Sequence, residues 1–237
     1  MLTPQTNKRI GQAMADYAML DDGDRVLVAV SGGVDSLVLL WLLQFWQRKA
    51  PVSYELFAVH IDMNIWKEGM EEAAPLPLLE EQMRLIGTEL HVETGLPLSE
   101  ESRTCYNCSK LRRKQLFDLA GRFECNKIAF GHHKDDLLET LFLNMFYSGN
   151  ISTMVPKQEL FEGRLAVIRP MAYIEKSEVE NIAEELGVTP VKNLCPLSGD
   201  TRREEVHKIL EGIYEQIPGA RASLFASMKN VRKGYML

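Results

Sequence analysis

The sequence predicts an α/β fold in which a doubly wound sheet of five parallel strands is covered by helices on both faces. Two observations lead to this prediction. Short apolar strand segments and longer helical segments alternate five times along the chain. A glycine-rich turn also joins the first strand directly to a helix. In a sheet of this kind, ligands bind at the carboxyl ends of the strands.

The elements follow one another in a regular order. The first strand, RVLVAV, is apolar without alternation, which indicates burial on both faces. Glycines after the last helical residue end the helices at 76–87 and 175–187. The helix over 135–149 carries apolar residues at helical spacing, at 137, 138, 141, 142 and 145. The five predicted strands are Arg25–Val30, Tyr54–Asp62, Thr88–Glu93, Lys127–His132 and Arg164–Pro170.

Three segments are expected along the chain. Residues 1–22 form an N-terminal helix, and residues 23–188 form the α/β domain, including the CxxC helix, whose helical pattern covers 109–123 from Ser109 onward. Residues 189–237 form a cysteine-bearing loop followed by helices. The chain thus has flanking helices at both ends of its α/β domain.

Composition indicates an ordinary globular protein. The 237 residues are 46% hydrophobic and 25% charged. The longest apolar run, Leu37–Leu43, is too short to cross a membrane. The first residues lack an apolar core followed by a cleavage site, so no secretion signal is expected. Four cysteines are too few for a disulfide scaffold, and we expect a cytoplasmic protein.

Charge is distributed unevenly over this acidic chain, whose formal net charge is -6. Residues 68–101 contain nine acidic residues and one base, Arg84. Residues 103–114 contain five bases and no acid, and residues 221–237 contain four bases and no acid. Each run is consistent with a solvated face, but a local basic face can also bind phosphates.

The segment SGGVDS, Ser31 to Ser36, is the strongest functional signal. Glycines permit a tight turn, and exposed backbone N–H groups at a helix N-terminus attract anions. The hydroxyls of Ser31 and Ser36 add donors, and Asp35 could hold Mg²⁺ or cap the helix. The loop lacks the GxxxxGK[ST] pattern of a Walker loop. The alternative is a plain glycine-rich connector.

Cysteines form a second signal. Cys105 and Cys108 are three residues apart and are followed by a basic run. The pair alone is compatible with a zinc site completed by His132 or His133, an iron–sulfur site, or a redox dithiol. Cys125 fits no ligand spacing, and we expect it to be a small core residue.

Two acidic residues, Asp135 and Asp136, follow the fourth predicted strand in GHHKDD. A carboxylate there could bind Mg²⁺, orient a substrate or accept a proton. Alternatively, acidic residues in the first turn of a helix simply complement its dipole.

The loop SGGVDS resembles the PP-loop of the ATP pyrophosphatases. Four further motifs resemble the TtcA-like tRNA 2-thiocytidine synthetases, which are Fe–S dependent tRNA thiolases. The similarity extends, with gaps, from about Val26 to Val231. The motifs are CYNCSKLRR, GHHKDDLLETLFLNMFYSG, VIRPMAYIEKSEVENIAEELG and NLCPLSGDTRREEVHKIL, and SLFASMKNV fits as well.

This resemblance implies a set of site residues. ATP would bind with its pyrophosphate at Ser31, Gly32, Gly33, Asp35 and Ser36, and its adenine near His60 and Asp62. A [4Fe–4S] cluster would be held by Cys105, Cys108 and Cys195. Asp135 would be catalytic, and Arg112 would be a basic catalytic residue.

The same resemblance implies an ATP- and Mg²⁺-dependent sulfurtransferase that adenylates a tRNA pyrimidine, cytidine in the named family, and replaces its oxygen with sulfur. Expected partners are the tRNA anticodon loop and a sulfur donor such as a cysteine desulfurase, and the family suggests a homodimer. Two alternatives remain open. One is a PP-loop sulfurtransferase or ligase acting on a small molecule, and the other is a non-catalytic nucleotide or redox sensor.

Overall fold

The computed structural model describes residues 2–65, 70, 74–99, 101, 103–197 and 201–235. Its contacts divide the chain into two compact units. The first contains Met1–His133 and Pro156–Ser198, and the second contains Lys134–Val155 and Gly199–Leu237. Each unit is described separately.

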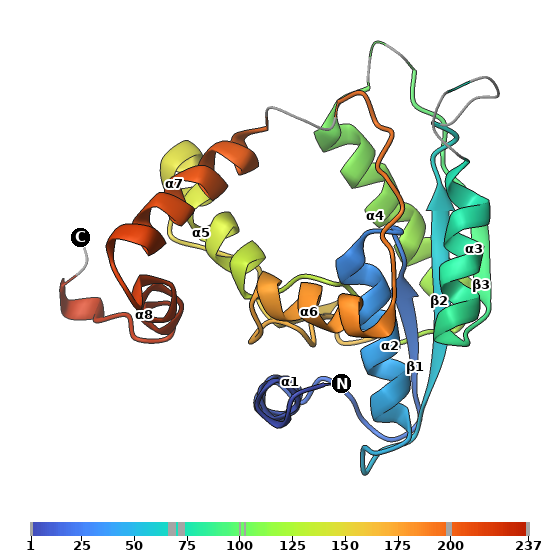
Figure 1. Ribbon diagram of the computed structural model, residues 1–237, viewed down its shortest axis with the longest axis horizontal. Coiled ribbons are helices and arrows are strands. Elements are labelled where there is room, and N and C mark those ends of the chain that lie inside the picture. Colours follow the sequence, from blue (N-terminus) through green and yellow to red (C-terminus); the bar gives the residue numbers. More distant parts are fainter. Residues whose placement is uncertain are drawn as a thin grey trace. The chain divides into compact units, whose positions relative to one another are not determined.

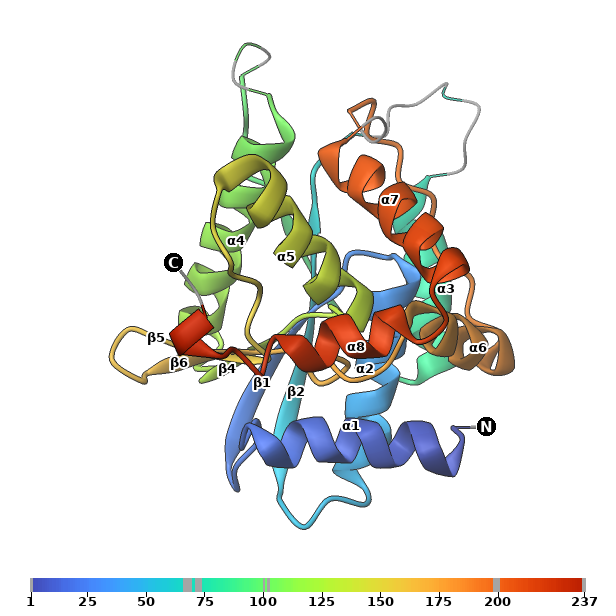
Figure 2. The same ribbon diagram turned by 90° about the vertical axis from the view of Figure 1, so that its left-hand side faces the viewer.

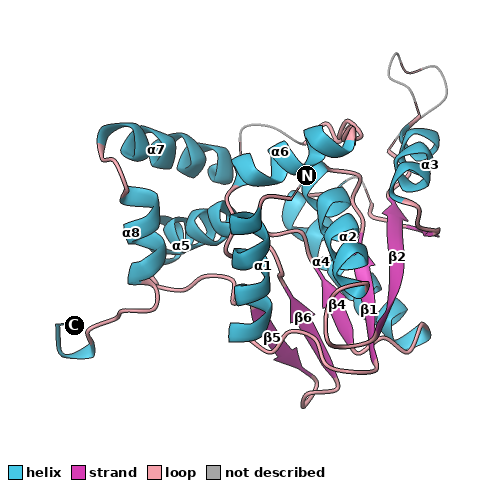
Figure 3. Cartoon of the chain, turned by 60° about the horizontal axis from the view of Figure 1, so that its bottom comes forward, coloured by secondary structure: helices cyan, strands magenta, loops and turns pink. Residues whose placement is uncertain are grey.

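A six-stranded sheet forms the centre of the first unit, in the order β3-β2-β1-β4-β6-β5, and β2, β1, β4, β6 and β5 can be followed in Figure 3. Five strands are parallel neighbours, which confirms the predicted doubly wound parallel sheet. The strands are β1 (Asp24–Ala29), β2 (Tyr54–Asp62), β3 (Leu90–Thr94), β4 (Lys127–Ala129), β5 (Lys157–Leu160) and β6 (Leu165–Ile168).

The predicted number of five strands was one too low. The additional strand, β5, pairs antiparallel with β6 at the edge of the sheet. Its sequence, KQEL, has no apolar run, because an edge strand with half-exposed and exposed side chains needs none. A turn at 161–163, with three consecutive residues at positive φ, reverses the chain between the two strands.

Strand β1 lies at the point where the order of the sheet reverses. It pairs with β2 on one side and with β4 on the other, and the chain extends outward from each. In open α/β sheets, a crevice forms at this position beyond the carboxyl ends of the strands. The glycine-rich loop begins directly after β1 and therefore lies at that crevice.

Helices cover both faces of the sheet in the first unit (Figure 1). Leu116 and Leu119 of α4 pack with Leu27 and Ile128 on one face. Neighbouring β1 residues such as Val28 point to the opposite face, where α2 contacts β1 and β2. The helices are α1 (Pro4–Asp16), α2 (Val34–Gln47), α3 (Pro75–Ile86), α4 (Cys105–Arg122) and α6 (Lys176–Leu186).

Helix α4 begins four residues earlier than the expected start at Ser109. Thr104 is its N-cap, and its hydroxyl accepts a hydrogen bond from the Asn107 amide at 3.1 Å. This cap places Cys105 and Cys108 inside the first turn of the helix rather than in a loop before it.

The second unit is helical and contains α5 (Lys134–Ser148), α7 (Arg202–Gln216), α8 (Ala220–Ser227) and the short 3₁₀ helix η2 (Lys233–Tyr235) (Figure 2). Leu138, Val206 and Leu210 form its small core. None of the helices in the described part of the chain is long and apolar enough to cross a membrane.

Candidate active site

The loop between β1 and α2 is held by the hydroxyl of Ser36. This hydroxyl donates to the Gly33 carbonyl at 2.8 Å and accepts from the Ser31 amide at 3.1 Å. Gly32 has a φ of +89°, a conformation that side chains rarely adopt, and Gly33 is the N-cap of α2. The sequence motif therefore forms a fixed turn at a helix N-terminus, where anions bind favourably.

Asp35, in the first turn of α2, has a cationic partner that the sequence did not reveal. Lys176, the first residue of α6, donates to its carboxylate at 2.7 Å, and His133 Nε2 lies 3.8 Å away. Gly131 also lies close, since a Cβ atom there would come within 2.8 Å of the Asp35 backbone. The loop after β4 and the start of α6 thus both support the glycine-rich loop.

A pocket of about 280 Å³ lies beyond the carboxyl ends of β1 and β2. Six predicted residues from three separate parts of the sequence line it together: Ser31, Gly32, Gly33, His60, Asp62 and Arg112. Asp35 and Ser36 are predicted site residues that support the loop beside it. The pocket therefore lies where a doubly wound sheet is expected to bind its ligand.

Residues 191–194 line the same pocket, a role that no motif in the sequence indicated. The Val191 amide donates to the Gly32 carbonyl at 2.9 Å, which fastens this segment over the loop. A Cβ atom at Gly32 would lie 3.3 Å from the Val191 side chain. The contact joins positions about 160 residues apart (191 minus 32), which no local sequence pattern could indicate.

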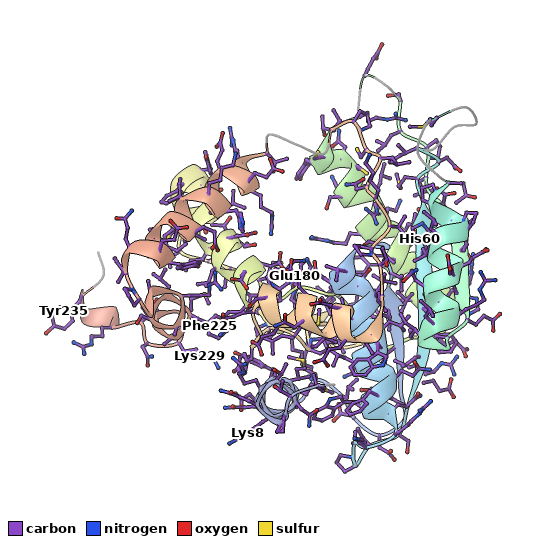
Figure 4. The ribbon with its side chains drawn as sticks, in the orientation of Figure 1. Lys8, His60, Glu180, Phe225, Lys229 and Tyr235 are labelled. Atoms are coloured by element: carbon purple, nitrogen blue, oxygen red, sulfur yellow. The ribbon has the colours of Figure 1, made fainter. Side chains whose placement is uncertain are left out.

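His60 links the ends of β2 and β1 (Figure 4). Its Nδ1 lies 2.8 Å from the Val30 carbonyl, so Nδ1 carries the proton and Nε2 is the unprotonated nitrogen of the neutral ring. Burial lowers the pKa of His60, and Arg112 adds to this effect, while the Val30 carbonyl and Asp62 oppose it. The ring is therefore neutral at physiological pH.

The three predicted cysteine ligands all belong to the first unit. Cys105 is exposed, and Cys108 and Cys195 are half-buried. The Cys105 thiol donates to the Leu197 carbonyl at 3.5 Å, so the segment after Cys195 contacts the first turn of α4. Among the described residues, no three His, Cys, Asp or Glu side chains are grouped closely enough to hold a metal ion. The ligand set remains a prediction.

The histidines proposed for a zinc site have other partners. Arg169 Nε donates to His132 Nδ1 at 3.3 Å, and His133 faces Asp35. Cys125 is buried in the core beneath α4, as expected, and burial raises the pKa of its thiol to about 11. Its thiol is therefore unsuited to bind metal or react.

Asp135 lies in the second unit, in the first turn of α5. It is buried, and its carboxylate pairs with Arg221 Nε of α8 at 3.2 Å. Its neighbour Asp136 pairs with Arg203 at 3.2 Å. Both carboxylates thus have ion-pair partners within their own unit, in addition to the dipole of α5.

Comparisons with known proteins identify the family. The model of the PP-loop domain family matches residues 2–197. The chain is 35% identical to the tRNA-cytidine(32) 2-sulfurtransferase of Saccharophagus degradans, over 97% of this chain and 75% of that protein. The enzyme of the same name from Haemophilus influenzae is 36% identical, over 99% of this chain and 76% of that protein.

A solved structure shows the same fold. The U34-tRNA thiolase NcsA from Methanococcus maripaludis, with its [4Fe-4S] cluster, superposes with a TM-score of 0.77 at 24% identity. The match covers 95% of this chain and 77% of that one. The sequence matches and the architecture of the site together place the chain in the PP-loop family and, within it, in the family of the tRNA-cytidine(32) 2-sulfurtransferases.

Proposed function

We propose that the protein is an ATP-dependent tRNA sulfurtransferase that adenylates cytidine 32 of a tRNA anticodon loop and replaces its 2-oxygen with sulfur. The observation that carries the proposal is the identity of 35–36% to enzymes of that name over nearly the whole chain. The pocket supports it, because it places the glycine-rich loop, the end of β2 and Arg112 around one space.

In the first step, ATP binds as its magnesium complex with its phosphates at the glycine-rich loop. The amides at the N-terminus of α2 attract the phosphate charge. The cytidine O2 attacks the α-phosphorus, forming the C–O–P bond of an adenylated base, and the bond to pyrophosphate breaks. We assign to Arg112 the stabilisation of negative charge that develops on the α-phosphate, because its side chain lines the pocket.

In the second step, a sulfur nucleophile attacks C2 of the adenylated base, and AMP leaves with the former O2 oxygen. We assign to Asp135 the proton transfer or base orientation that this exchange requires. Its carboxylate lies 3.2 Å from Arg221 Nε, and this ion pair holds the side chain in place. The neutral His60 keeps an unprotonated Nε2 and therefore adds no positive charge beside the nucleotide.

Three thiols fit an iron–sulfur cluster by donor chemistry. We propose that Cys105, Cys108 and Cys195 hold a [4Fe–4S] cluster, supported by the contact between Cys105 and the segment after Cys195. Bound there, the cluster would supply an iron that can carry sulfur. The engagement of His132 and His133 elsewhere disfavours the zinc alternative.

Several other parts of the proposal concern the cell rather than the site. We propose a cytoplasmic location, because a reducing compartment keeps half-exposed cysteines as thiols. A protein such as a cysteine desulfurase would supply the sulfur, and a homodimer would be the working form.

The proposal is tested by anaerobic purification of the wild type and of single cysteine variants, with Cys125→Ala as the matched control. Wild type and Cys125→Ala should contain iron and acid-labile sulfide and should thiolate tRNA. Cys105→Ala, Cys108→Ala and Cys195→Ala should lose both iron and thiolation. Stoichiometric zinc in colourless wild-type protein would contradict the cluster.

The same preparations separate the alternative functions. A small-molecule sulfurtransferase would convert ATP to AMP without binding tRNA. A non-catalytic sensor would bind ATP without forming AMP. We expect AMP formation that depends on tRNA.

A further inference from the structure

The first turns of α4 carry an exposed stripe formed by Tyr106, Lys110 and Arg113, which the site described above does not use. These residues are spaced i, i+4 and i+7, so they lie within about 60° of one another around the helix axis. All three are exposed, and the Tyr106 residue is 74% accessible. Within the described part of the chain, their side chains form no hydrogen bond, ion pair or ring contact.

The stripe points away from the residues of the pocket. Arg112 lines the pocket, and it lies about 120° around the helix from Tyr106. Further along, Leu116 and Leu119 of the same helix are buried in the core. Helix α4 therefore divides its basic run: Arg112 faces the pocket, and Lys110 and Arg113 face outward beside the cysteine turn.

The chemistry of the stripe matches a single-stranded nucleic acid. An exposed aromatic ring offers a flat surface on which an unpaired base can stack. Lysine and arginine beside it can pair with backbone phosphates. Residues 103–114 carry five bases and no acid in a chain whose net charge is -6, so this positive charge is a local feature.

We propose that this stripe binds the single-stranded loop of the RNA substrate, with Tyr106 stacking on an unpaired base and Lys110 and Arg113 neutralising phosphates next to it. The proposal rests on the proposed function, which requires an RNA loop close to the cysteines. Tyr106 lies between Cys105 and Cys108 in the sequence, so a base stacked on it is held beside the proposed sulfur carrier.

The stripe could instead bind a protein, but the residues exposed around it are mostly polar or charged, which disfavours a protein partner. Protein interfaces place several large apolar side chains at their centre. On α4, Tyr106 is the only large apolar or aromatic residue classed as exposed, and beside its first turn the exposed apolar side chain is that of Leu197, whose carbonyl accepts from the Cys105 thiol. The exposed neighbours of Tyr106 on α4, Ser109 and Lys114, are polar or charged.

The test is the binding of a fluorescein-labelled anticodon stem-loop RNA, measured by anisotropy at several salt concentrations. Tyr106→Ala should raise the Kd about 5- to 150-fold, which corresponds to the roughly 1–3 kcal/mol of one stacked base. Tyr106→Phe keeps the ring and should bind like the wild type. The double variant Lys110→Ala/Arg113→Ala should lower the salt slope by about 2, one unit for each lost phosphate contact.

A matched control removes two exposed cations elsewhere. Lys8 on α1, labelled in Figure 4, and Arg84 on α3 are both exposed. The variant Lys8→Ala/Arg84→Ala has the same change in charge and should keep the wild-type affinity and salt slope. Thermal melting and ATP binding establish that each variant is folded.

The outcomes separate this inference from the proposed function. If the wild type binds and thiolates RNA while both stripe variants bind like the wild type, the stripe is not the RNA contact. If those variants bind RNA normally but lose sulfur transfer from a protein donor, the stripe docks a protein and the inference is overturned. If the wild type does not bind RNA, the proposed function itself fails.

Discussion

At the scale of single residues, the site depends on close backbone packing as much as on side-chain chemistry. Gly131 shows this most clearly, because its missing Cβ leaves space for the backbone of Asp35. The glycine is the first residue of GHHKDD, in which only the two acidic residues were predicted to have a functional role. Its role depends on a contact between two loops, which no spacing along the chain indicates.

Gly131→Ala should therefore move the glycine-rich loop. The added methyl group would lie 2.8 Å from the Asp35 carbonyl, which must shift. We expect a loss of roughly 1–3 kcal/mol in the free energy of unfolding, as for other overpacked sites, together with weaker ATP binding. Denaturant titration and calorimetry measure the two effects.

Gly121→Ala provides the matched control for this substitution. Gly121 lies in α4, and a Cβ atom there would meet nothing within 4 Å. Alanine favours a helix, so stability should be unchanged or raised by up to about 1 kcal/mol. Equal behaviour of the two variants would contradict the role assigned to Gly131.

The lowered pKa of His60 predicts how the stability of the protein depends on pH. Because burial lowers its pKa below the ordinary value of 6.5, the folded state binds this proton less readily than the unfolded chain. The free energy of unfolding should therefore decrease as pH falls below about 6.5. His60→Asn removes the titrating group and should show a shallower decrease between pH 7 and 5 in urea titrations. An identical pH dependence in both proteins would show that His60 does not titrate in this way.

At the scale of elements, the start of α4 decides how the cysteine pair is presented. The expected helix began at Ser109, because the basic run is the obvious helical segment. The hydroxyl of Thr104 extends the helix backward by one turn. The cap could have been found in the sequence, since threonine is a favoured N-cap residue.

Thr104→Ala should loosen this first turn. Loss of the cap costs about 1 kcal/mol, and the Asn107 and Cys108 amides should exchange hydrogen faster. Thr104→Ser keeps the hydroxyl and should restore protection. Thr201 caps α7 in the same manner, so Thr201→Ala should leave exchange at Asn107 unchanged. Unaltered exchange in Thr104→Ala would contradict the capping role.

The elements also show which kinds of segment the sequence predicts well. Buried parallel strands and their helices have strong apolar patterns, and β2 was placed with its observed bounds, Tyr54–Asp62. The edge strand β5 was missed, because it pairs with only one other strand and its side chains are half-buried or exposed, so KQEL needs no apolar pattern. Local patterns reveal burial, and an edge strand has little of it.

At the scale of the whole molecule, a local motif predicted the glycine-rich loop, the family resemblance implied His60, Asp62 and Arg112, and the fold gathers these residues around one pocket. The fold also adds residues to the site that no sequence motif predicted. Lys176 and residues 191–194 follow the last parallel strand, yet they contact the loop after the first. Such contacts depend on the order of the strands in the sheet. The sequence predicts that the sheet is doubly wound, but it does not predict which loops then meet.

The two compact units divide the proposed chemistry. The nucleotide pocket and the three cysteines belong to the first unit, and Asp135 belongs to the second. Asp135 pairs with Arg221, so a substitution of Asp135 could lower activity either by removing this ion pair or by removing a catalytic carboxylate. Asp135→Asn preserves the shape of the side chain and tests the chemistry more directly than alanine does.

The measurement that tests the central claim most directly is nucleoside mass spectrometry of tRNA from cells that lack this protein. We predict that 2-thiocytidine disappears, that the wild-type chain restores it, and that Asp135→Asn and Cys195→Ala do not. The Cys125→Ala control should restore it, because that thiol is buried in the core. An unchanged 2-thiocytidine content in the deletion strain would contradict the proposed function.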